Sequence, residues 1–434
     1  MKTKTRLSLI LLTLFFSLGT SLANAAFELA DGKFKVGAQA RFRYEFFNNT
    51  DFASTTNDTL DYVLTRVRPT FSYLPHEKVE VLLQPQFTAG WGELFGTSVT
   101  SVNAVAGGST SGALNDPAFG VHQAYMLYKP ASWFALTLGR QEWNYGDQLV
   151  IGGVDWHNVG RSFDAMKMHF SGSNYWIDAL YSYLSDAESG AARGVATGST
   201  GDHHFGGLYA SIDLADWLKA WDLYALYRLD STARPRAHNY LTFGTRFKGQ
   251  SKGWDYRLEA TGQFGKSTIT GVNANQKDWQ ADLEVGYTWT DFYQFRIGLE
   301  AFAASKNYIQ MFPTAHKWIG FVDLFGRRNI MGGVAHFSMK PSEKWGLSLD
   351  AHTIFRNSGA TGLFRLNGVT LIGGTGASSS KLAGEELDFS VSYAALDILS
   401  FKAGVNAFIP MGFIKTEVGS AVPLFGYLQS NLSF

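Results

Sequence analysis

The sequence contains no cysteine. Disulfides, thiolate chemistry, and haem or iron–sulfur groups held by cysteine are therefore excluded. The chain also lacks an excess of either charge, because 37 basic and 37 acidic residues give a formal net charge of zero. Composition alone thus indicates neither a nucleic-acid partner nor a strongly anionic one, and any electrostatic selectivity must arise locally.

Long apolar runs are missing everywhere except at the N-terminus. There, three basic residues precede an apolar stretch over residues 7–22, and small residues follow at positions 23–25, which is the pattern of a signal peptide with its cleavage site. The stretch is shorter than the ~20 apolar residues that a helical membrane span needs. We therefore predict a cleaved signal peptide at residues 1–25 and a mature chain of residues 26–434.

The mature chain shows an alternation of apolar and polar residues with a period of two. Residues 33–46 place Phe, Val, Ala and Tyr on one face and Lys, Gln, Arg and Glu on the other. The pattern recurs at residues 254–264, 279–289, 294–303 and 345–356, and the chain ends in an alternating segment closed by Phe434. Each segment has about the ten residues that a tilted strand needs to cross a bilayer.

Long connections alternate with short turns along the whole mature chain. The long ones fall near residues 47–59, 92–118, 142–162, 185–203, 231–238, 266–277, 305–329, 357–383 and 409–423. Outer-membrane barrels have short periplasmic turns and longer extracellular loops. We therefore predict a single all-β domain in the outer membrane of a Gram-negative bacterium: an antiparallel transmembrane barrel of about eighteen strands, with sixteen as the alternative count. A barrel of this size encloses an aqueous channel.

Charged residues on the lumen-facing parity are nearly balanced in sign. Arg66, Arg68, Arg296 and Arg356 are candidates for a lumenal selectivity role, because a guanidinium binds a carboxylate in two-point contact. The alternative is that such arginines pair with carboxylates on neighbouring strands and stiffen the wall. Aromatic residues at strand ends, such as Trp133, Trp254, Trp289 and Trp345, are typical of interface girdles, and a sugar-stacking slide is the other interpretation.

Two loop segments depart from the usual composition of extracellular loops. Residues 138–165 contain Gly139-Arg140-Gln141-Glu142, Tyr145-Gly146-Asp147 and Gly160-Arg161-Ser162-Phe163-Asp164, and residues 311–329 contain Phe312-Pro313-Thr314-Ala315-His316 and Asp323-Leu324-Phe325-Gly326. Their mixture of aromatic, glycine and charged residues indicates elements that fold inward or act as lids. Whether they gate the pore is left open by the sequence.

In their order, these motifs, together with Gly384-Glu385-Glu386-Leu387-Asp388, resemble the alginate export family of outer-membrane proteins. The resemblance implies a monomeric eighteen-stranded barrel with a pore constricted by arginines, through which an anionic uronate polysaccharide moves outward. It carries over two arginines by motif, Arg140 and Arg161, with Asp164 holding Arg161 in place as a hypothesis.

The predicted function is therefore a passive outer-membrane channel for an anionic polysaccharide or related anionic solutes. The alternative is a general or substrate-specific diffusion porin, because lumenal acids almost match the bases. No recognisable nucleophile motif accompanies the loop histidines, so we predict no enzyme and no catalytic residues.

We also expect no cofactor, no metal site and no nucleic-acid partner. His203 and His204 are adjacent on a strand and so point to opposite faces, which argues against joint metal binding. The expected surroundings are outer-membrane lipid and lipopolysaccharide. The strand that ends at Phe434 is the expected contact for the barrel-assembly machinery.

Overall fold

The structure is a computed structural model that describes residues 27–29, 31–55, 58–92, 118–185, 203–230, 238–267, 274–368, 370–374 and 378–434. Within these residues, eighteen strands form one closed antiparallel barrel, which confirms the predicted fold and strand count. The predicted signal peptide lies outside the described residues. Among the described residues, no helix is long and apolar enough to cross a membrane.

The barrel closes by pairing of its first and last strands, β2 and β21, with Arg41 opposite Asn431. The barrel strands are β2 (Phe34–Asn48), β3 (Leu60–His76), β4 (Val79–Gly92), β5 (Ala118–Ala131), β6 (Phe134–Gln141), β7 (Phe163–Ser171), β8 (Tyr175–Ser185), β9 (His203–Ile212), β10 (Ala220–Asp230), β11 (His238–Ser251), β12 (Trp254–Ser267), β13 (Ala274–Trp289), β14 (Phe295–Ala304), β15 (Ile330–Ser342), β16 (Trp345–Arg356), β19 (Leu382–Leu396), β20 (Leu399–Pro410) and β21 (Leu424–Ser433). Short β1 (Phe27–Leu29) pairs with the start of β2.

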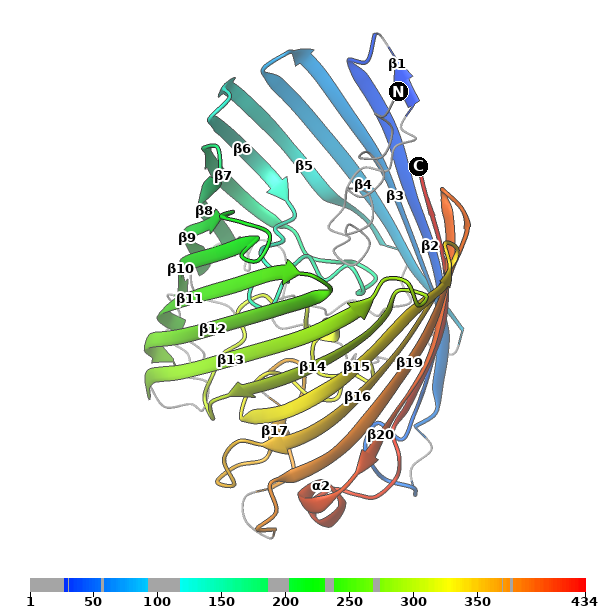
Figure 1. Cartoon of the computed structure of the whole chain (residues 1–434). Helices are drawn as coiled ribbons and strands as arrows, with labels where there is room; N and C mark the ends of the chain where they lie inside the picture. The colour runs from blue at the N-terminus through cyan, green and yellow to red at the C-terminus, as the bar shows by residue number, and fades with distance from the viewer. Residues whose placement is uncertain are drawn as a thin grey trace.

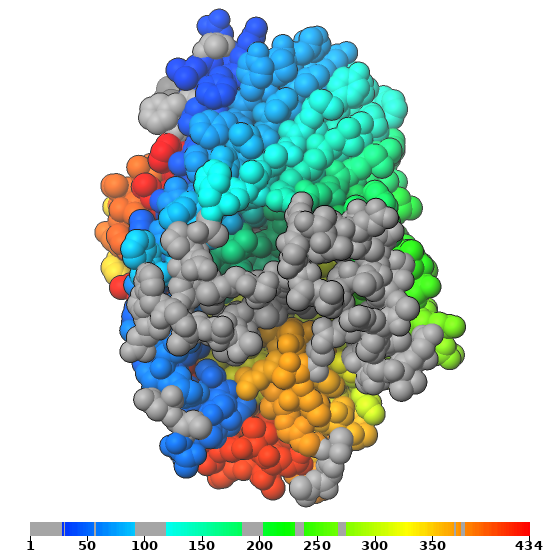
Figure 2. Space-filling view, turned by 180° about the vertical axis from the view of Figure 1, so that it is seen from behind, coloured from blue at the N-terminus to red at the C-terminus, as the bar shows by residue number. Residues whose placement is uncertain are grey.

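Connections at one end of the barrel are long and those at the other end are short. β1 and the C-terminus lie at the end opposite α2 (Gly412–Glu417) (Figure 1). The connection that contains α2 contacts the neighbouring connection, where β17 (Leu363–Phe364) and β18 (Leu371–Ile372) pair, through the Glu417 carboxylate and the Gly374 amide at 3.0 Å. Figure 2 shows these red and orange segments side by side. This is the predicted arrangement of long extracellular loops.

The outer surface is apolar and the inner surface is polar, as the alternation requires for a barrel in lipid. Leu299 and Val405 are 64% and 67% exposed, whereas lumen-facing Arg66 and Glu386 are fully buried. Trp133, Trp254 and Trp345 are exposed beside the short turns, which is the position of an interface girdle.

Buried apolar side chains lie inside the barrel because two long connections fold into it. These are residues 142–162 between β6 and β7 (the 142–162 loop) and residues 305–329 between β14 and β15 (the 305–329 loop), which includes the 3₁₀ turn η1 (Ala315–Lys317). Trp143 and Phe312 from these loops pack in one cluster with strand residues such as Phe205, and Trp318 and Phe325 pack in a second with Phe408. The loops and the inner wall thus share a core, and Figure 1 shows their traces inside the strands.

Candidate functional site

Four arginines from two adjacent strands converge on the middle of the 142–162 loop. Arg41 and Arg43 come from β2, and Arg66 and Arg68 come from β3. Arg41 and Arg66 are directly opposite each other in the register. Like charges in this position repel, so the arrangement requires an acceptor between them.

The acceptor is Asp155 together with the backbone around it. Its carboxylate lies 2.7 Å from Arg66 Nη2, 3.2 Å from Arg68 Nη1 and 3.8 Å from Arg41 Nη1. Backbone carbonyls complete the set: Arg41 and Arg66 both donate to the Asp155 oxygen, at 2.6 and 2.9 Å, and Arg68 donates to the Val159 oxygen at 2.9 Å. Three guanidiniums therefore face a single carboxylate.

Arg43 completes the contact between loop and wall in a different way. It pairs with Glu45 at 2.5 Å, donates to the Trp156 carbonyl at 2.8 Å, and lies over the Trp156 ring at 3.8 Å. The Trp156 ring in turn stacks on His316 of the 305–329 loop at 4.1 Å. The two inward loops are thus coupled at the arginine wall.

The charge around Asp155 alters the ionisation of the loop. Burial alone would raise the pKa of the Asp155 carboxyl, but Arg66, Arg41 and Arg68 lower it well below its usual range. Burial, reinforced by Arg43 and Arg41, lowers the pKa of the nearby His157 to about 4. Near neutral pH the loop therefore presents an anion and a neutral imidazole to the arginines.

Little space remains between the loop and this wall. The cavity bounded by Arg43, Glu45, Trp156 and Asp323 has a volume of about 30 Å³. A single water needs roughly 10–15 Å³ of such volume, so the cavity holds a water or two and no sugar. Any solute that contacts these arginines must displace the loop.

Arg161, one of the two arginines predicted from the motif, links the two inward loops. Its guanidinium donates to the carbonyls of Gly152 and Pro313, both at 3.0 Å. The same loops are joined by a parallel bridge between Ile151 and Phe312. Burial and the charge of nearby Arg228 lower the pKa of Arg161 to about 9. Arg161 therefore lies inside the barrel, and its role in binding solute at a constriction stays a prediction.

Arg140 and Asp164 lie on the other face of the wall. They form a bidentate pair at 2.8 and 2.6 Å, and their side chains are 43% and 59% exposed. Arg140 has the parity of the exposed Leu138, whereas neighbouring Gln141 points inward and accepts from the buried Trp143 indole at 3.0 Å. The expectation that Arg140 and Asp164 form the constriction is therefore corrected: they pair with each other on the outer surface, and Asp164 does not hold Arg161.

Backbone requirements explain why glycines appear in these motifs. Gly139 has φ of +121°, and a Cβ there would lie 2.3 Å from the Ala124 carbonyl oxygen. Gly160 has φ of +74°, and a Cβ there would lie 2.6 Å from Arg68 Nη2. Both conformations are accessible to glycine at little cost. The glycines of the motif are therefore needed for the backbone conformation near the two ends of the 142–162 loop.

The remaining predicted arginines all have partners. Arg66 and Arg68 hold the loop as described. Arg296 donates to Asp255 at 2.9 and 2.5 Å and to Glu284 at 2.7 Å, so it is part of cross-strand pairing. Arg356 donates to the carbonyls of Ser380 and Ser378, at 3.0 and 2.5 Å, and holds a connection near the extracellular end.

The wall formed by β12, β13 and β14 has the opposite charge. Its inward residues include six carboxylates but only two guanidiniums, and these are Asp255, Glu259, Asp278, Asp282, Glu284 and Glu300 against Arg257 and Arg296. The 305–329 loop supplies a further cation here, because Arg327 Nη2 lies 2.6 Å from Asp282. The lumen is therefore balanced in total but polarised from one side to the other.

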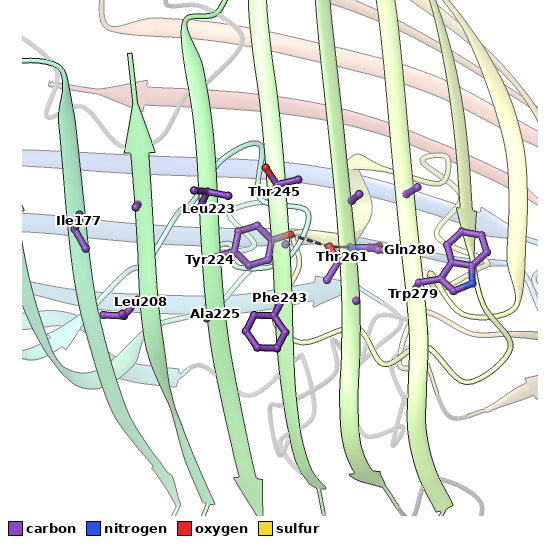
Figure 3. A pocket seen from close by; sticks show the side chains of 15 residues that line it. Ile177, Leu208, Leu223, Tyr224, Ala225, Phe243, Thr245, Thr261, Trp279 and Gln280 are labelled. Carbon is purple, nitrogen blue, oxygen red and sulfur yellow. Dashed lines mark hydrogen bonds between the residues drawn. The ribbon is translucent and has the colours of Figure 1, made fainter. Parts of the chain in front are cut away.

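A hollow on the outer surface is separate from this site. It measures about 770 Å³ and is lined by outward apolar residues, including Leu208, Phe243 and Trp279, which are 53%, 46% and 47% exposed. Figure 3 shows them around a strip of the wall where Tyr224 and Thr261 are hydrogen-bonded. A furrow of this kind faces lipid and is no part of the conduit.

The predicted orientation of the adjacent histidines is confirmed. His203 pairs with inward Asp230 at 2.9 Å, whereas His204 contacts the exposed Tyr181 hydroxyl at 3.0 Å, so the adjacent histidines do face opposite sides. Sequence reasoning missed Asp155 as the acceptor for the arginines. The one available signal was its position beside Trp156 in a loop with an unusual composition.

These features define an outer-membrane channel protein whose barrel is partly filled by its own loops. The chain belongs to the alginate export family, since the family model described as alginate export matches residues 33–427. Among curated proteins, none matches the chain.

Solved structures share the fold at low sequence identity. OccD3 (OpdP) of Pseudomonas aeruginosa is 12% identical with a TM-score of 0.59, and the match covers 94% of this chain and 93% of that one. OccAB1 of Acinetobacter baumannii is 10% identical with a TM-score of 0.61, over 96% and 100% of the two chains. OprD of Pseudomonas aeruginosa is 9% identical with a TM-score of 0.57, over 92% and 94%.

Proposed function

We propose that the protein conducts an anionic polysaccharide, or related anionic solutes, along the wall formed by Arg41, Arg43, Arg66 and Arg68. The observation that carries the proposal is the convergence of three of these guanidiniums on the Asp155 carboxylate, at 2.7 to 3.8 Å. Guanidinium groups bind planar carboxylates through paired hydrogen bonds. Asp155 therefore occupies the position that a uronate carboxylate of the solute would take.

In this mechanism the 142–162 loop acts as an internal competitor. It supplies one carboxylate and several carbonyls to the arginines, and it leaves only about 30 Å³ beside them. A polyanion brings many carboxylates, so it can replace the loop at each arginine in turn while water and the solute satisfy the released carbonyls. Passage needs no energy input under this scheme, because each contact exchanged is replaced by one of the same kind.

The test removes the competing carboxylate and keeps the loop length. We expect Asp155→Asn to raise the anion preference measured by reversal potential in planar bilayers, and to lengthen the conducting state. Asp213→Asn is the matched control, because Asp213 is an exposed carboxylate in a short turn, paired with Lys219 at 3.3 Å. An unchanged selectivity in Asp155→Asn would contradict the proposal.

The runner-up is a diffusion porin for small solutes, which the acidic wall of β12–β14 favours. Facing walls of opposite charge create a transverse field that can admit solutes of either sign. The discriminating measurement is block of the ion current by a short oligouronate and by a neutral maltooligosaccharide of equal length. Block at a much lower concentration of the oligouronate supports the anion conduit, and equal block supports the porin.

A further inference from the structure

On the acidic wall, three strands bring two carboxylates and an imidazole together. Glu284 on β13 lies directly opposite Glu300 on β14, and His336 on β15 pairs with Gly298, diagonally adjacent to Glu300. The ligating atoms of Glu284, Glu300 and His336 all lie within 4.8 Å of one another. Two like charges directly opposite each other repel, so this arrangement depends on positive charge beside it, part of which Arg257 supplies.

The orientation of His336 is set from behind by another carboxylate. Its Nδ1 lies 2.8 Å from Asp350 Oδ1, and its Nε2 faces Glu300 Oε2 at 3.4 Å. Metal-binding histidines characteristically donate the other ring N–H to a carboxylate in this way, which fixes the tautomer and directs the free lone pair at the ion. Asp350 would be such an orienting group.

Two polar atoms of the cluster lack hydrogen-bond partners despite their burial. The Glu300 side chain is 5% exposed, and both its Oε1 and the Nε2 of His336 are buried without a hydrogen bond. Arg257 contacts Oε2 of Glu300 and of Glu284, at 3.1 and 3.3 Å, so it does not supply a partner to Glu300 Oε1. Buried acceptors without partners are rare, because each costs free energy.

Charge around the cluster also remains unbalanced when His336 is neutral. The network joined by ion pairs then contains four carboxylates and three guanidiniums, which are Asp255, Asp282, Glu284 and Glu300 with Arg257, Arg296 and Arg327. The Asp350 carboxylate lies behind the imidazole, so the cluster keeps an excess of negative charge that attracts a cation.

We propose that Glu284, Glu300 and His336 form a binding site for a first-row divalent cation of the Zn²⁺ type. One imidazole with two carboxylates is a donor set that zinc accepts, whereas Mg²⁺ and Ca²⁺ favour oxygen ligands alone. Bonds of about 2.0–2.2 Å in a tetrahedron separate ligand atoms by roughly 3.3–3.6 Å. The 3.4 Å between His336 Nε2 and Glu300 Oε2 fits already, and rotation of the Glu284 side chain closes the rest.

The site opens on the lumen, which gives the ion a fourth ligand and an effect on conduction. Glu284 and His336 are 21% and 22% exposed at their side chains, so a lumenal water completes the coordination. A bound dication would neutralise the centre of the acidic wall. The pore would then become more selective for anions, in the direction set by the arginines on the opposite side.

Isothermal titration of Zn²⁺ into the full-length mature protein tests this proposal. The protein is purified in detergent without a polyhistidine tag and stripped with EDTA, and Mg²⁺ serves as the competing ion. We expect one saturable Zn²⁺ site per chain that Mg²⁺ does not fill. Asp350→Asn should weaken it by about 10–100-fold, as loss of an orienting carboxylate does elsewhere, and His336→Asn should abolish it.

His169→Asn is the matched control, because His169 makes the same contact to a carboxylate, Asp178 Oδ1 at 2.6 Å, on a distant part of the wall. Its Zn²⁺ binding should equal that of the unaltered protein. Folding of each variant is checked by the heat-dependent shift in gel mobility. If His336→Asn does not fold, the Zn²⁺ affinity of Asp350→Asn alone tests the proposal. Absence of saturable binding overturns the proposal, and a protonated His336 that bridges Glu300 and Asp350 would produce this result. Binding that survives both substitutions also overturns it.

Discussion

Buried charge is compensated in opposite ways on the two sides of the lumen. On β2 and β3, four arginines are accompanied by one inward glutamate, Glu45, and the acceptors come from the 142–162 loop. On β12–β14, carboxylates predominate, and the 305–329 loop supplies Arg327. Each wall is therefore covered by a loop that supplies groups of the opposite charge.

This comparison shows why a formal net charge of zero says little about the pore. The opposite charges are distributed to different walls, and a loop compensates part of the charge on each wall. A loop can move, whereas a neighbouring strand cannot. One of the two covering loops will be released more easily than the other. The charge of the wall that this loop exposes will decide whether the pore admits anionic or cationic solutes.

Removing two arginines should produce the largest change. Arg66→Ala combined with Arg68→Ala deletes the two shortest contacts to the Asp155 carboxylate. The Asp155 side chain is 48% exposed, so water can solvate the carboxylate once these partners are gone, and the 142–162 loop should leave the wall. We expect a larger, noisier single-channel conductance together with loss of anion preference, both measured in planar bilayers.

Arg296→Ala combined with Arg356→Ala is the comparison variant, since it also removes two lumenal arginines but leaves the loop contacts intact. Its anion preference should stay closer to that of the unaltered channel. If the two double variants lose anion preference equally, the arginines act only through total charge and the distinction between the walls fails.

Neutralising the acidic wall should have the second-largest effect and the opposite sign. Glu284→Gln with Glu300→Gln removes the directly opposed pair of carboxylates and leaves Arg257 with Asp282 at 2.6 Å. The reversal potential under a salt gradient should move toward anion selectivity. A shift toward cation selectivity would mean that these carboxylates do not face the conducting path.

The barrel was predictable because its pattern is local. Alternation in segments such as residues 254–264 and 345–356 needs no knowledge of the rest of the chain, and the loop lengths supplied the topology and the eighteen strands. The inward course of residues 142–162 was less accessible, because it depends on contacts such as Arg66 with Asp155, 89 positions apart in the chain. Composition could indicate an unusual loop but not its partners.

The error over Arg140 has a specific cause. Leu136, Leu138 and Arg140 share one parity in β6, so the alternation itself places Arg140 on the outer face with the exposed Leu138. The motif resemblance indicates a lumenal position for Arg140, whereas the parity of β6 indicates the outer face. The cluster of Glu284, Glu300 and His336 was missed for another reason, namely that its members come from three strands whose register cannot be read from sequence.

Acidification should loosen the arginine wall by a smaller amount. Burial lowers the pKa of docked His157 to about 4, and Arg43 and Arg41 add to this, whereas in a released loop the imidazole would titrate near 6.5. The docked state thus binds fewer protons, so docking is at full strength above pH 6.5 and weakens as pH falls toward 4. We expect more frequent opening at pH 4.5 than at pH 7, and a His157→Gln variant whose opening depends less on pH.

The smallest effect should come from Arg140→Ala, even though the motif resemblance selected this residue first. Its pair with Asp164 lies on the outer surface, away from the lumen, with side chains 43% and 59% accessible. We expect an unchanged reversal potential under a salt gradient, measured in planar bilayers. A change in selectivity would require Arg140 to reach the lumen, and β6 would then have to pair one residue out of the register that puts Gln141 against Trp143.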